Sequence, residues 1–365
     1  MIPFTPPALA IQAPYAPRPE LDAGHYLAAL AEAERRLQQN PGNALAWAAK
    51  SQALSSLQRF PEARAAADRA LALQPGLADA LLARGLARAG TAIQQRNLGS
   101  LRKALGALDD FRAAAQADPT LQDAWMSLGL AYEMLPGILG GSTHKALACA
   151  ASLRRVNPSR GDLLQALVLV QEDRWQDAEP YFGRALATAP GDPEIVAEYL
   201  DSLDSHAAKH ALGEAGKNAR LLGEAARLLP PVAWSARAVS AASDADLNAG
   251  RPDLAWQVVQ AHLGHTDAPS LLRLQLGKVA ARSGQYLPEG LAALDQVLRE
   301  PLEGGSAGYA GAWWRKGQIL KALGRIPEAR QAAQQALKLD PKHRGAEELL
   351  ESLRAIASKS QVPEG

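Results

Sequence analysis

Apolar residues recur along this chain with the spacing of an amphipathic helix. One face of a helix with 3.6 residues per turn takes positions i, i+3, i+4 and i+7, and these are filled by Trp125, Leu128, Gly129 and Tyr132. A break at 135–137 follows, and a second helical pattern runs from about 143 to 156. The pattern predicts two helices joined by a turn.

Prolines close such helical segments repeatedly. The segments end at Pro41, Pro75, Pro119, Pro158, Pro190 and, more loosely, Pro230, with spacings of 34, 44, 39, 32 and 40 residues. Pro341 closes another segment near the C-terminus. Because proline cannot continue a helix and restricts the residue before it, each of these marks a helix end. The spacing predicts a repeated helical pair, with inserted loops at 90–100 and 134–142 where the interval is long.

This pattern resembles the tetratricopeptide repeat, whose first-helix signature is matched at every position by the Trp125 to Tyr132 segment. The second-helix signature, an alanine, a phenylalanine four residues on and a later proline, recurs as well. The residues that carry the structural signature are Trp47, Trp125, Leu128, Gly129, Tyr132, Ala178, Phe182, Trp313 and Gly317. The resemblance implies an all-α fold, a right-handed superhelical α-solenoid of helix-turn-helix repeats with a C-terminal capping helix.

The repeats cover the chain unevenly. We expect a proline-rich tail at 1–20, about five repeats over 21–190 and divergent helical pairs over 191–302. The last repeat and the capping helix are expected over 303–357, followed by a tail at 358–365. This leaves no segment long enough for a separate catalytic domain.

Composition narrows the classes of partner. Lys+Arg is 39 and Asp+Glu is 38, so the net charge of +1 provides no field to attract nucleic acid or an anionic membrane. Apolar runs are far shorter than the ~20 residues of a membrane span. Early prolines interrupt any signal peptide. We therefore expect a cytoplasmic protein with no nucleic-acid or membrane partner.

The chain offers few candidates for chemistry. His206 and His210 have the i, i+4 spacing of a metal-binding pair, but no third ligand is evident, so they are interpreted as surface histidines. The glycine-rich segment 137–145 is not a phosphate loop, and it is interpreted as a wide turn with Ser142 or Thr143 capping the next helix. Cys149 is expected to be a buried structural thiol. We expect no metal, no cofactor and no enzymatic activity.

The resemblance implies that the first helices of the repeats line a concave groove that binds a partner segment. The predicted groove residues are Asp79, Leu82, Leu86, Asp123, Met126, Leu130, Glu133, Asp162, Gln165, Leu169, Glu172, Asp173 and Trp314. Such a groove suits a protein or peptide segment with apolar anchors and basic residues. The alternative is that these acids form an ordinary solvated face. The pattern says nothing of oligomeric state.

The favoured function is therefore a non-catalytic scaffold for protein–protein interaction. Two alternatives are a periplasmic or transport-linked repeat subunit and an enzyme subunit built on helical hairpins. The absence of a recognisable signal peptide disfavours the first alternative. The second would need a clustered polar site that the spacing does not reveal.

Overall fold

The computed structural model describes residues 26–95, 98–266, 268–300 and 308–359, and these residues form α-helices and two 3₁₀ helices with no strand. The predicted all-α solenoid is thus confirmed. The predicted tail at 1–20 and residues 360–365 of the second tail lie outside the described residues.

The helices divide between two compact units, residues 1–117 and 118–365. Unit 1 contains α2 (Tyr26–Gln39), α3 (Ala44–Ser56), α4 (Phe60–Leu73), α5 (Ala78–Gln95) and α6 (Leu98–Ala117). Unit 2 contains α7 (Gln122–Met134), η1 (Gly137–Leu139), α8 (Thr143–Val156), α9 (Pro158–Gln171), α10 (Trp175–Thr188), α11 (Pro193–Leu203), α12 (His206–Leu228), η2 (Pro230–Val232), α13 (Ala236–Asn248), α14 (Pro252–His262), α15 (Pro269–Ser283), α16 (Leu287–Val297), α17 (Gly308–Ala322), α18 (Ile326–Leu339) and α19 (Arg344–Lys359). The boundary falls inside the segment 21–190 that the sequence suggests is one block of repeats.

Each of the seven prolines predicted to close a segment lies at or close to a helix end, as expected from the sequence. Small polar residues begin several of the helices that follow. Ser142 accepts a hydrogen bond from the amide of Lys145 at the start of α8, and Asn157 does the same for Arg160 in α9. These caps satisfy amides that have no partner within the first turn of a helix. The predicted second helix at 143–156 is confirmed as α8.

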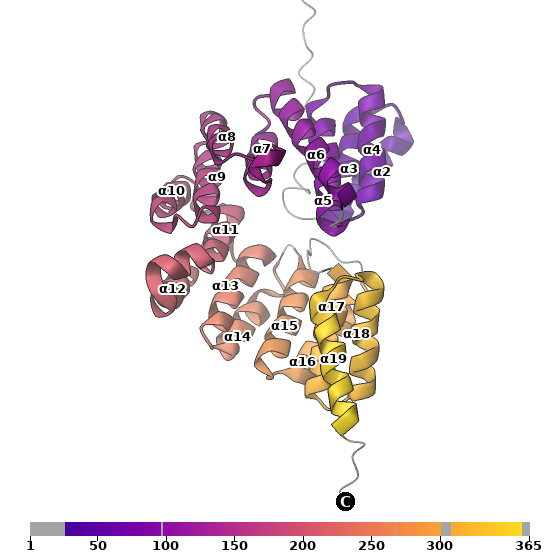
Figure 1. Ribbon diagram of the computed structural model, residues 1–365, viewed down its shortest axis with the longest axis vertical. Helices are drawn as coiled ribbons and strands as arrows, with labels where there is room; N and C mark the ends of the chain where they lie inside the picture. Colours follow the sequence, from indigo (N-terminus) through magenta and orange to yellow (C-terminus); the bar gives the residue numbers. More distant parts are fainter. Residues whose placement is uncertain (1–25, 96–97, 267, 301–307, 360–365) are drawn as a thin grey trace, which may run out of the picture. The chain divides into compact units, whose positions relative to one another are not determined.

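Within unit 2 the helices pair into hairpins, and the hairpins stack (Figure 1). The first helices α7, α9, α11, α13, α15 and α17 each pack on the next one along the chain. The second helices of neighbouring hairpins make much less contact with one another; α10 and α12 are the clearest pair. The stack therefore curves toward its first helices, because the spacing between hairpins is smaller on that side.

The insertion predicted as a loop at 90–100 has a different structure. Helix α5 continues to Gln95 and α6 begins at Leu98, so most of the additional residues lengthen the two helices of the hairpin. The expectation of a loop was wrong because the segment contains no proline, and its alanine, glutamine and leucine residues favour helix. The insertion at 134–142, which does contain a proline, forms a loop with the short helix η1.

Small residues set the distance between neighbouring helices. In α17, a Cβ added at Gly317 would lie 2.8 Å from the side chain of Leu349 and 3.2 Å from the carbonyl oxygen of Ala329. In α9, a Cβ at Gly161 would lie 2.4 Å from the backbone nitrogen and Cα of Arg154 in α8. Alanines with no exposed surface recur along the second helices, so close packing of backbones, rather than of large side chains, joins many of the pairs.

Large side chains gather at one point of unit 2. Trp175, Phe182 and Tyr199 are buried and contact one another, with ring centroids between 5.2 and 6.5 Å apart. Because they come from α10 and α11, they join the last of the clear repeats to the first of the divergent ones. The stack continues across this junction.

The predicted capping helix is α19. Ala346, Leu349 and Leu353 are buried against the preceding helices, whereas Glu347, Glu348 and Arg354 are exposed. A polar outer face is what the last helix of a stack requires, since no further repeat covers it.

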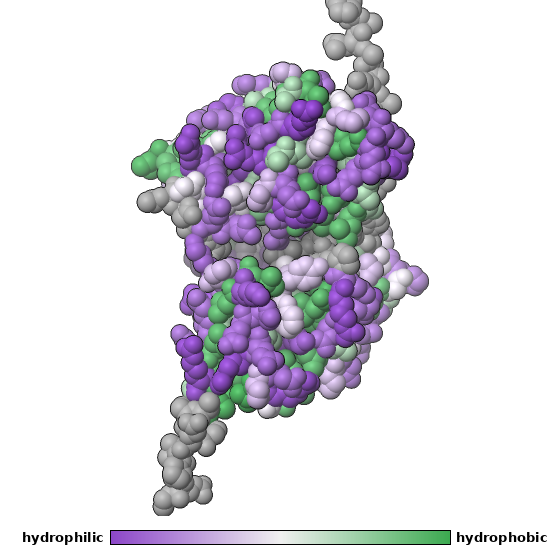
Figure 2. All heavy atoms as spheres, turned by 90° about the vertical axis from the view of Figure 1, so that its right-hand side faces the viewer, coloured by the Kyte–Doolittle hydropathy of each residue, from purple (hydrophilic) through white to green (hydrophobic). Residues whose placement is uncertain are grey.

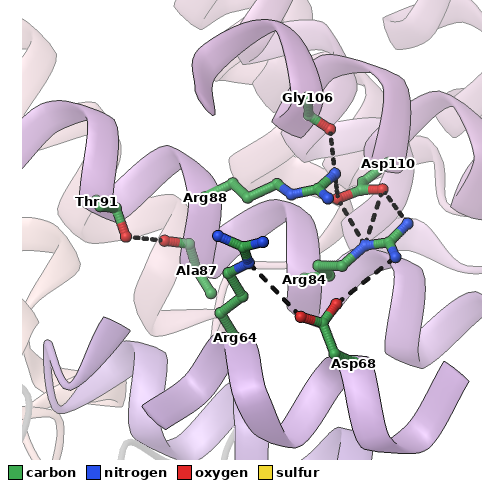
Figure 3. A network of polar contacts seen from close by, with 8 residues as sticks. All are labelled: Arg64, Asp68, Arg84, Ala87, Arg88, Thr91, Gly106 and Asp110. Atoms are coloured by element: carbon green, nitrogen blue, oxygen red, sulfur yellow. Dashed lines mark hydrogen bonds and ion pairs between the residues drawn. The ribbon is translucent and has the colours of Figure 1, made fainter. Parts of the chain in front are cut away.

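A charge network in unit 1 ties α5 to α6 (Figure 3). Asp110 of α6 is 3% exposed and accepts hydrogen bonds from Arg84 and Arg88 of α5, each with a closest distance of 2.6 Å. Arg84 also lies 3.7 Å from Asp68 of α4, so the network spans three helices. Arg88 donates a further bond to the carbonyl oxygen of Gly106.

The close approach of α8 and α9 generates the first prediction. Gly161→Ala should lower the free energy of unfolding by about 1–3 kcal/mol, because the new methyl group meets backbone atoms that cannot move independently. Gly183→Ala is the matched control, since nothing lies within 4 Å of a Cβ added there in the middle of α10. It should gain up to about 1 kcal/mol from helix propensity. Urea unfolding of both variants checks this, and equal midpoints would contradict it.

The network in unit 1 generates the second prediction. Asp110→Ala should cost about 3–5 kcal/mol, because two partly buried guanidinium groups lose their carboxylate. Its neighbour Asp109 is exposed and pairs with Arg112 one helical turn away, so Asp109→Ala should cost no more than about 1 kcal/mol. Thermal unfolding followed by circular dichroism distinguishes the two. A cost for Asp110→Ala as small as that of the control would show that the network contributes little.

Candidate functional site

Not all of the predicted groove residues lie at the surface of their unit. Three of them are buried and cannot contact a partner: Leu82 is 1% exposed, Leu169 is 3% exposed and Asp162 is 5% exposed. For these three the expectation was wrong. The two leucines lie on the faces of α5 and α9 that pack into the core.

Asp162 is buried as part of an ion-pair cluster. Arg154 donates to its carboxylate at 2.8 Å, and Arg184 lies on the other side at 3.2 Å. These arginines come from α8 and α10, so Asp162 is enclosed between the two second helices that flank α9. Arg154 also donates to Gln165, another predicted groove residue, at 2.6 Å.

The remaining predicted residues are accessible to different degrees. Leu86, Met126 and Leu130 are partly buried, and Met126 packs against the core of unit 2. Asp79 is partly buried and Asp123 is exposed, and the side chain or backbone of each takes part in an interaction within the protein. Trp314 packs over Gly345, lies 5.1 Å from the ring of His343 and carries the guanidinium of Arg315 on its face. It therefore belongs to the packing of α17 on α19.

Three predicted acids gather at the ends of α7 and α9. Thr143 donates a hydrogen bond to Glu172 at 3.0 Å. Burial and the neighbouring carboxylate of Glu172 raise the pKa of Glu133. Asp173 lies 3.3 Å from Nδ1 of His206 and 3.3 Å from Nδ1 of His210. In the part of the chain that the structure describes, no group of three His, Cys, Asp or Glu side chains is arranged to hold a metal ion.

The loop at 134–142 presents apolar side chains to solvent. Ile138 is 92% exposed and Met134 is 70% exposed. The loop is held by hydrogen bonds from the amides of Leu139 and Gly141 to the carbonyl oxygen of Pro136. On the face shown in Figure 2, hydrophilic side chains predominate and apolar ones are interspersed among them. Cys149 is buried, and burial raises the pKa of its thiol to about 11, as expected of a structural cysteine.

Side chains that converge on a cavity lie instead in the divergent region. The α11–α15 pocket has a volume of about 190 Å³. Its apolar wall consists of Leu200, Leu221, Ala241 and Ala245, and its polar wall of Asp201, Asp204, Asp244, Asn248, Lys278 and Arg282. Asp244 and Asn248 are four residues apart on α13, as are Lys278 and Arg282 on α15, so each pair occupies one face of its helix. Residues of three successive first helices therefore build this pocket together with Leu221 of the second helix α12.

A buried hydrogen-bond chain positions part of the polar wall. The amide of Gln275 donates to Oδ1 of Asp244 at 2.8 Å and to Oγ of Ser243 at 3.1 Å. Ser243 in turn donates to the carbonyl oxygen of Ala255 in α14. Lys278 donates to the second oxygen of Asp244 at 2.5 Å. Asp244 is thus held from two sides and its charge is matched.

Most other charges near the pocket are also paired. Asp204 accepts from Lys217 and Asn248, both at 2.6 Å, and Arg282 donates to Asn248 at 2.9 Å. Glu198 pairs with Arg237. These contacts connect α11, α12, α13 and α15 through their polar residues.

Three groups of this surface, Asp201, Arg282 and Arg315, form no ion pair with a described residue, and Arg282 is bonded only to the neutral side chain of Asn248. No described side chain makes a hydrogen bond or ion pair with the Asp201 carboxylate. Loss of surrounding water raises its pKa to about 6, although Arg237 opposes the shift. Arg315 of α17 contacts Trp314 and Gln318 but no carboxylate. Burial, followed by the charge of Arg282, lowers the pKa of Arg315 to about 10.

Comparison with known proteins identifies the repeat. Residues 20–78 and 310–343 match family models described as tetratricopeptide repeat. The chain contains tetratricopeptide repeats. The comparison with curated proteins finds no match. The two matched segments leave residues 79–309 between them, and the α11–α15 pocket lies within this stretch.

Several solved structures are similar to this repeat protein. A thermophilic TPR protein from Thermus thermophilus is 21% identical over 52% of this chain and 99% of its own, with a TM-score of 0.44. A tetratricopeptide repeat protein from Parabacteroides merdae is 16% identical over 74% and 96%, with a TM-score of 0.45. Yeast Tom70 is 13% identical over 93% and 80%, with a TM-score of 0.49. Because each TM-score lies below 0.5, the fold described above rests on the helix contacts of this chain.

The carboxylate of Asp201 generates the third prediction. Its pKa is 3.8 in an unfolded chain and about 6 in the folded protein, so the folded state binds more protons between these values. The stability therefore falls as pH rises from about 4 to 6 and then levels off. Asp201→Asn should be more stable than the wild type at pH 8, and the difference should vanish below pH 4.

The thermal unfolding midpoints of the wild type and of Asp201→Asn, measured at pH 8 and below pH 4, check this prediction. The control is Asp177→Asn, an exposed aspartate of α10 that pairs with Arg174 on the surface. Its effect should be small at both pH values. A midpoint for Asp201→Asn that follows the wild type at every pH would show that the folded protein does not perturb this carboxylate.

Proposed function

We propose that this protein is a non-catalytic scaffold that binds a segment of a partner protein on the first-helix face of unit 2. This face is defined by the pocket-lining sides of α11, α13 and α15 together with Arg315 of α17. The observation that carries the proposal is the α11–α15 pocket, whose walls come from three consecutive repeats. A site built by several repeats suits an extended segment that crosses them in turn.

The chemistry of the pocket also supports binding. Apart from Asp201, its charged groups are held in place by hydrogen bonds, and no described nucleophile stands beside a base within it. Preorganised polar groups around a small apolar wall provide orientation and contact area for a ligand. No described helix has both the length and the apolar character that crossing a membrane requires. A cytoplasmic location stays a prediction.

The predicted apolar and basic character of the partner needs revision under this proposal. Asp162 is neutralised by two arginines, and Asp173 lies against two histidines. The acids expected to attract a basic segment are thus partly engaged by the protein itself. The first-helix face of unit 2 carries charge of both signs.

Blocking the pocket tests the proposal. Asn248→Trp places an indole in the pocket, so proteins that immobilised wild type retains from an extract of its source cells should be lost. Gln260→Trp is the matched control, because Gln260 is exposed on the second helix α14. Quantitative mass spectrometry compares the three captures, with circular dichroism confirming equal folding. Equal retention by Asn248→Trp and wild type would contradict the proposal.

A further inference from the structure

The loop between α7 and α8 carries several apolar residues that are exposed to solvent. Met134 is 70% exposed, Ile138 within η1 is 92% exposed, and Pro136 between them is exposed as well. Single exposed apolar side chains are common on protein surfaces, but several gathered on one short segment are typical of an interaction surface. The loop is therefore a candidate for contact with another molecule.

Hydrogen bonds close the base of this loop and hold its shape. The amide of Ser142 donates to the carbonyl oxygen of Tyr132 at 2.8 Å, so the chain returns to the point where it left α7. Gly141 fits only without a side chain, because a Cβ there would lie 1.7 Å from the carbonyl oxygen of Leu135. A loop held in this way has little conformational freedom to lose on binding, so its exposed side chains are already placed for a partner.

Two carboxylates lie at the base of the loop. Glu133 precedes the loop near the end of α7, and Thr143, which follows the loop, donates a hydrogen bond at 3.0 Å to Glu172, the C-cap of α9. Oε2 of Glu133 is buried and accepts no hydrogen bond from a described residue. Neither glutamate forms an ion pair with a described side chain, whereas the neighbouring Asp173 contacts two histidines.

The two carboxylates are close enough to repel each other. Burial, followed by the charge of Glu172, raises the pKa of Glu133. Both groups also lie at the C-terminal ends of helices, where the helix dipole adds negative potential. A cation between them relieves this repulsion. The described residues provide no group of three ligands for a metal ion, so a basic side chain is the cation that suits this position.

We propose that the 134–142 loop, together with Glu133 and Glu172, forms a docking surface for a partner protein segment that carries a basic side chain beside large apolar ones. The apolar side chains of the segment cover Met134 and Ile138, and its lysine or arginine lies between the two carboxylates. An acidic segment would be repelled, and a purely polar one would leave the apolar side chains in water. This surface shares no lining residue with the α11–α15 pocket, so the inference goes beyond the proposed function.

Peptide selection tests this inference. Phage-displayed random peptides are selected on the full chain with Asn248→Trp, in which the α11–α15 pocket is blocked. We expect the enriched peptides to combine a lysine or arginine with large apolar residues. Adding Ile138→Asp should abolish their enrichment, because a charge then replaces the most exposed apolar side chain of the loop. Adding Glu133→Gln/Glu172→Gln instead should keep the apolar residues and lose the basic preference.

Matched variants control the selection. Ile93→Asp changes an isoleucine that is 56% exposed on α5, and Glu347→Gln/Glu351→Gln removes two exposed carboxylates from α19. Both should reproduce the original pattern. For one enriched peptide, fluorescence anisotropy should show a Kd about tenfold or more weaker with Glu133→Gln/Glu172→Gln. The same peptide with alanine in place of its basic residue should not respond to that variant.

The results that would overturn the inference are distinct from those that bear on the proposed function. Enriched peptides that bind equally well after Ile138→Asp do not use the loop, and a basic preference that persists after Glu133→Gln/Glu172→Gln does not come from the two carboxylates. Failure to enrich any peptide would overturn the inference as well. A wild-type dimer in sedimentation velocity that dissociates with Ile138→Asp would assign the loop to a second copy of this chain instead. None of these results concerns the α11–α15 pocket.

Discussion

The contact between consecutive first helices is the constraint on which the rest of unit 2 depends. A single helical hairpin cannot bury its apolar face, so each one is stable only against its neighbours. Glycine and alanine at the helix contacts let backbones approach, and where α9 meets the preceding second helix α8 the approach at Gly161 leaves no room for even one methyl group. Because the first helices pack in series and the second helices diverge, successive first helices present one face to a common surface. The α11–α15 pocket is a consequence of that curvature.

The repeat signature predicts packing well because it is local. A tryptophan, a glycine four residues later and a closing proline are read within one hairpin, and the structure places helix ends at or close to each predicted proline. Even a detail recurs: the indole nitrogens of Trp47 and Trp125 each donate to the carbonyl oxygen of the proline six residues before, both at 2.9 Å. Local spacing fixes these contacts, so a sequence is sufficient to find them.

The candidate site was less predictable for two physical reasons. Whether a polar residue faces solvent depends on partners distant in sequence, and Asp162 is buried because arginines from both flanking helices neutralise it. The spacing alone also does not fix which face of a helix is buried, so a core residue such as Leu82 was predicted to lie in the groove. The pocket was missed because α11, α13 and α15 lack the tryptophan signature that locates first helices. The acidic composition of α11 and the basic composition of α15 and α17 were the signals that could have found it.

The helix contact beside the pocket differs in chemistry from the repeat signature. The signature positions hold apolar and small residues that stack hairpins, whereas the contact between α13 and α15 includes Ser243 and Gln275, which are 0% and 6% exposed. Buried polar groups cost stability unless every one is satisfied, and here Gln275 is bonded to both Ser243 and Asp244. These bonds fix the orientation of the Asp244 carboxylate at the surface. Apolar residues in their place could not orient this charged group. In this region buried polar contacts therefore provide defined positions for charge, which is what recognition of a polar partner segment requires.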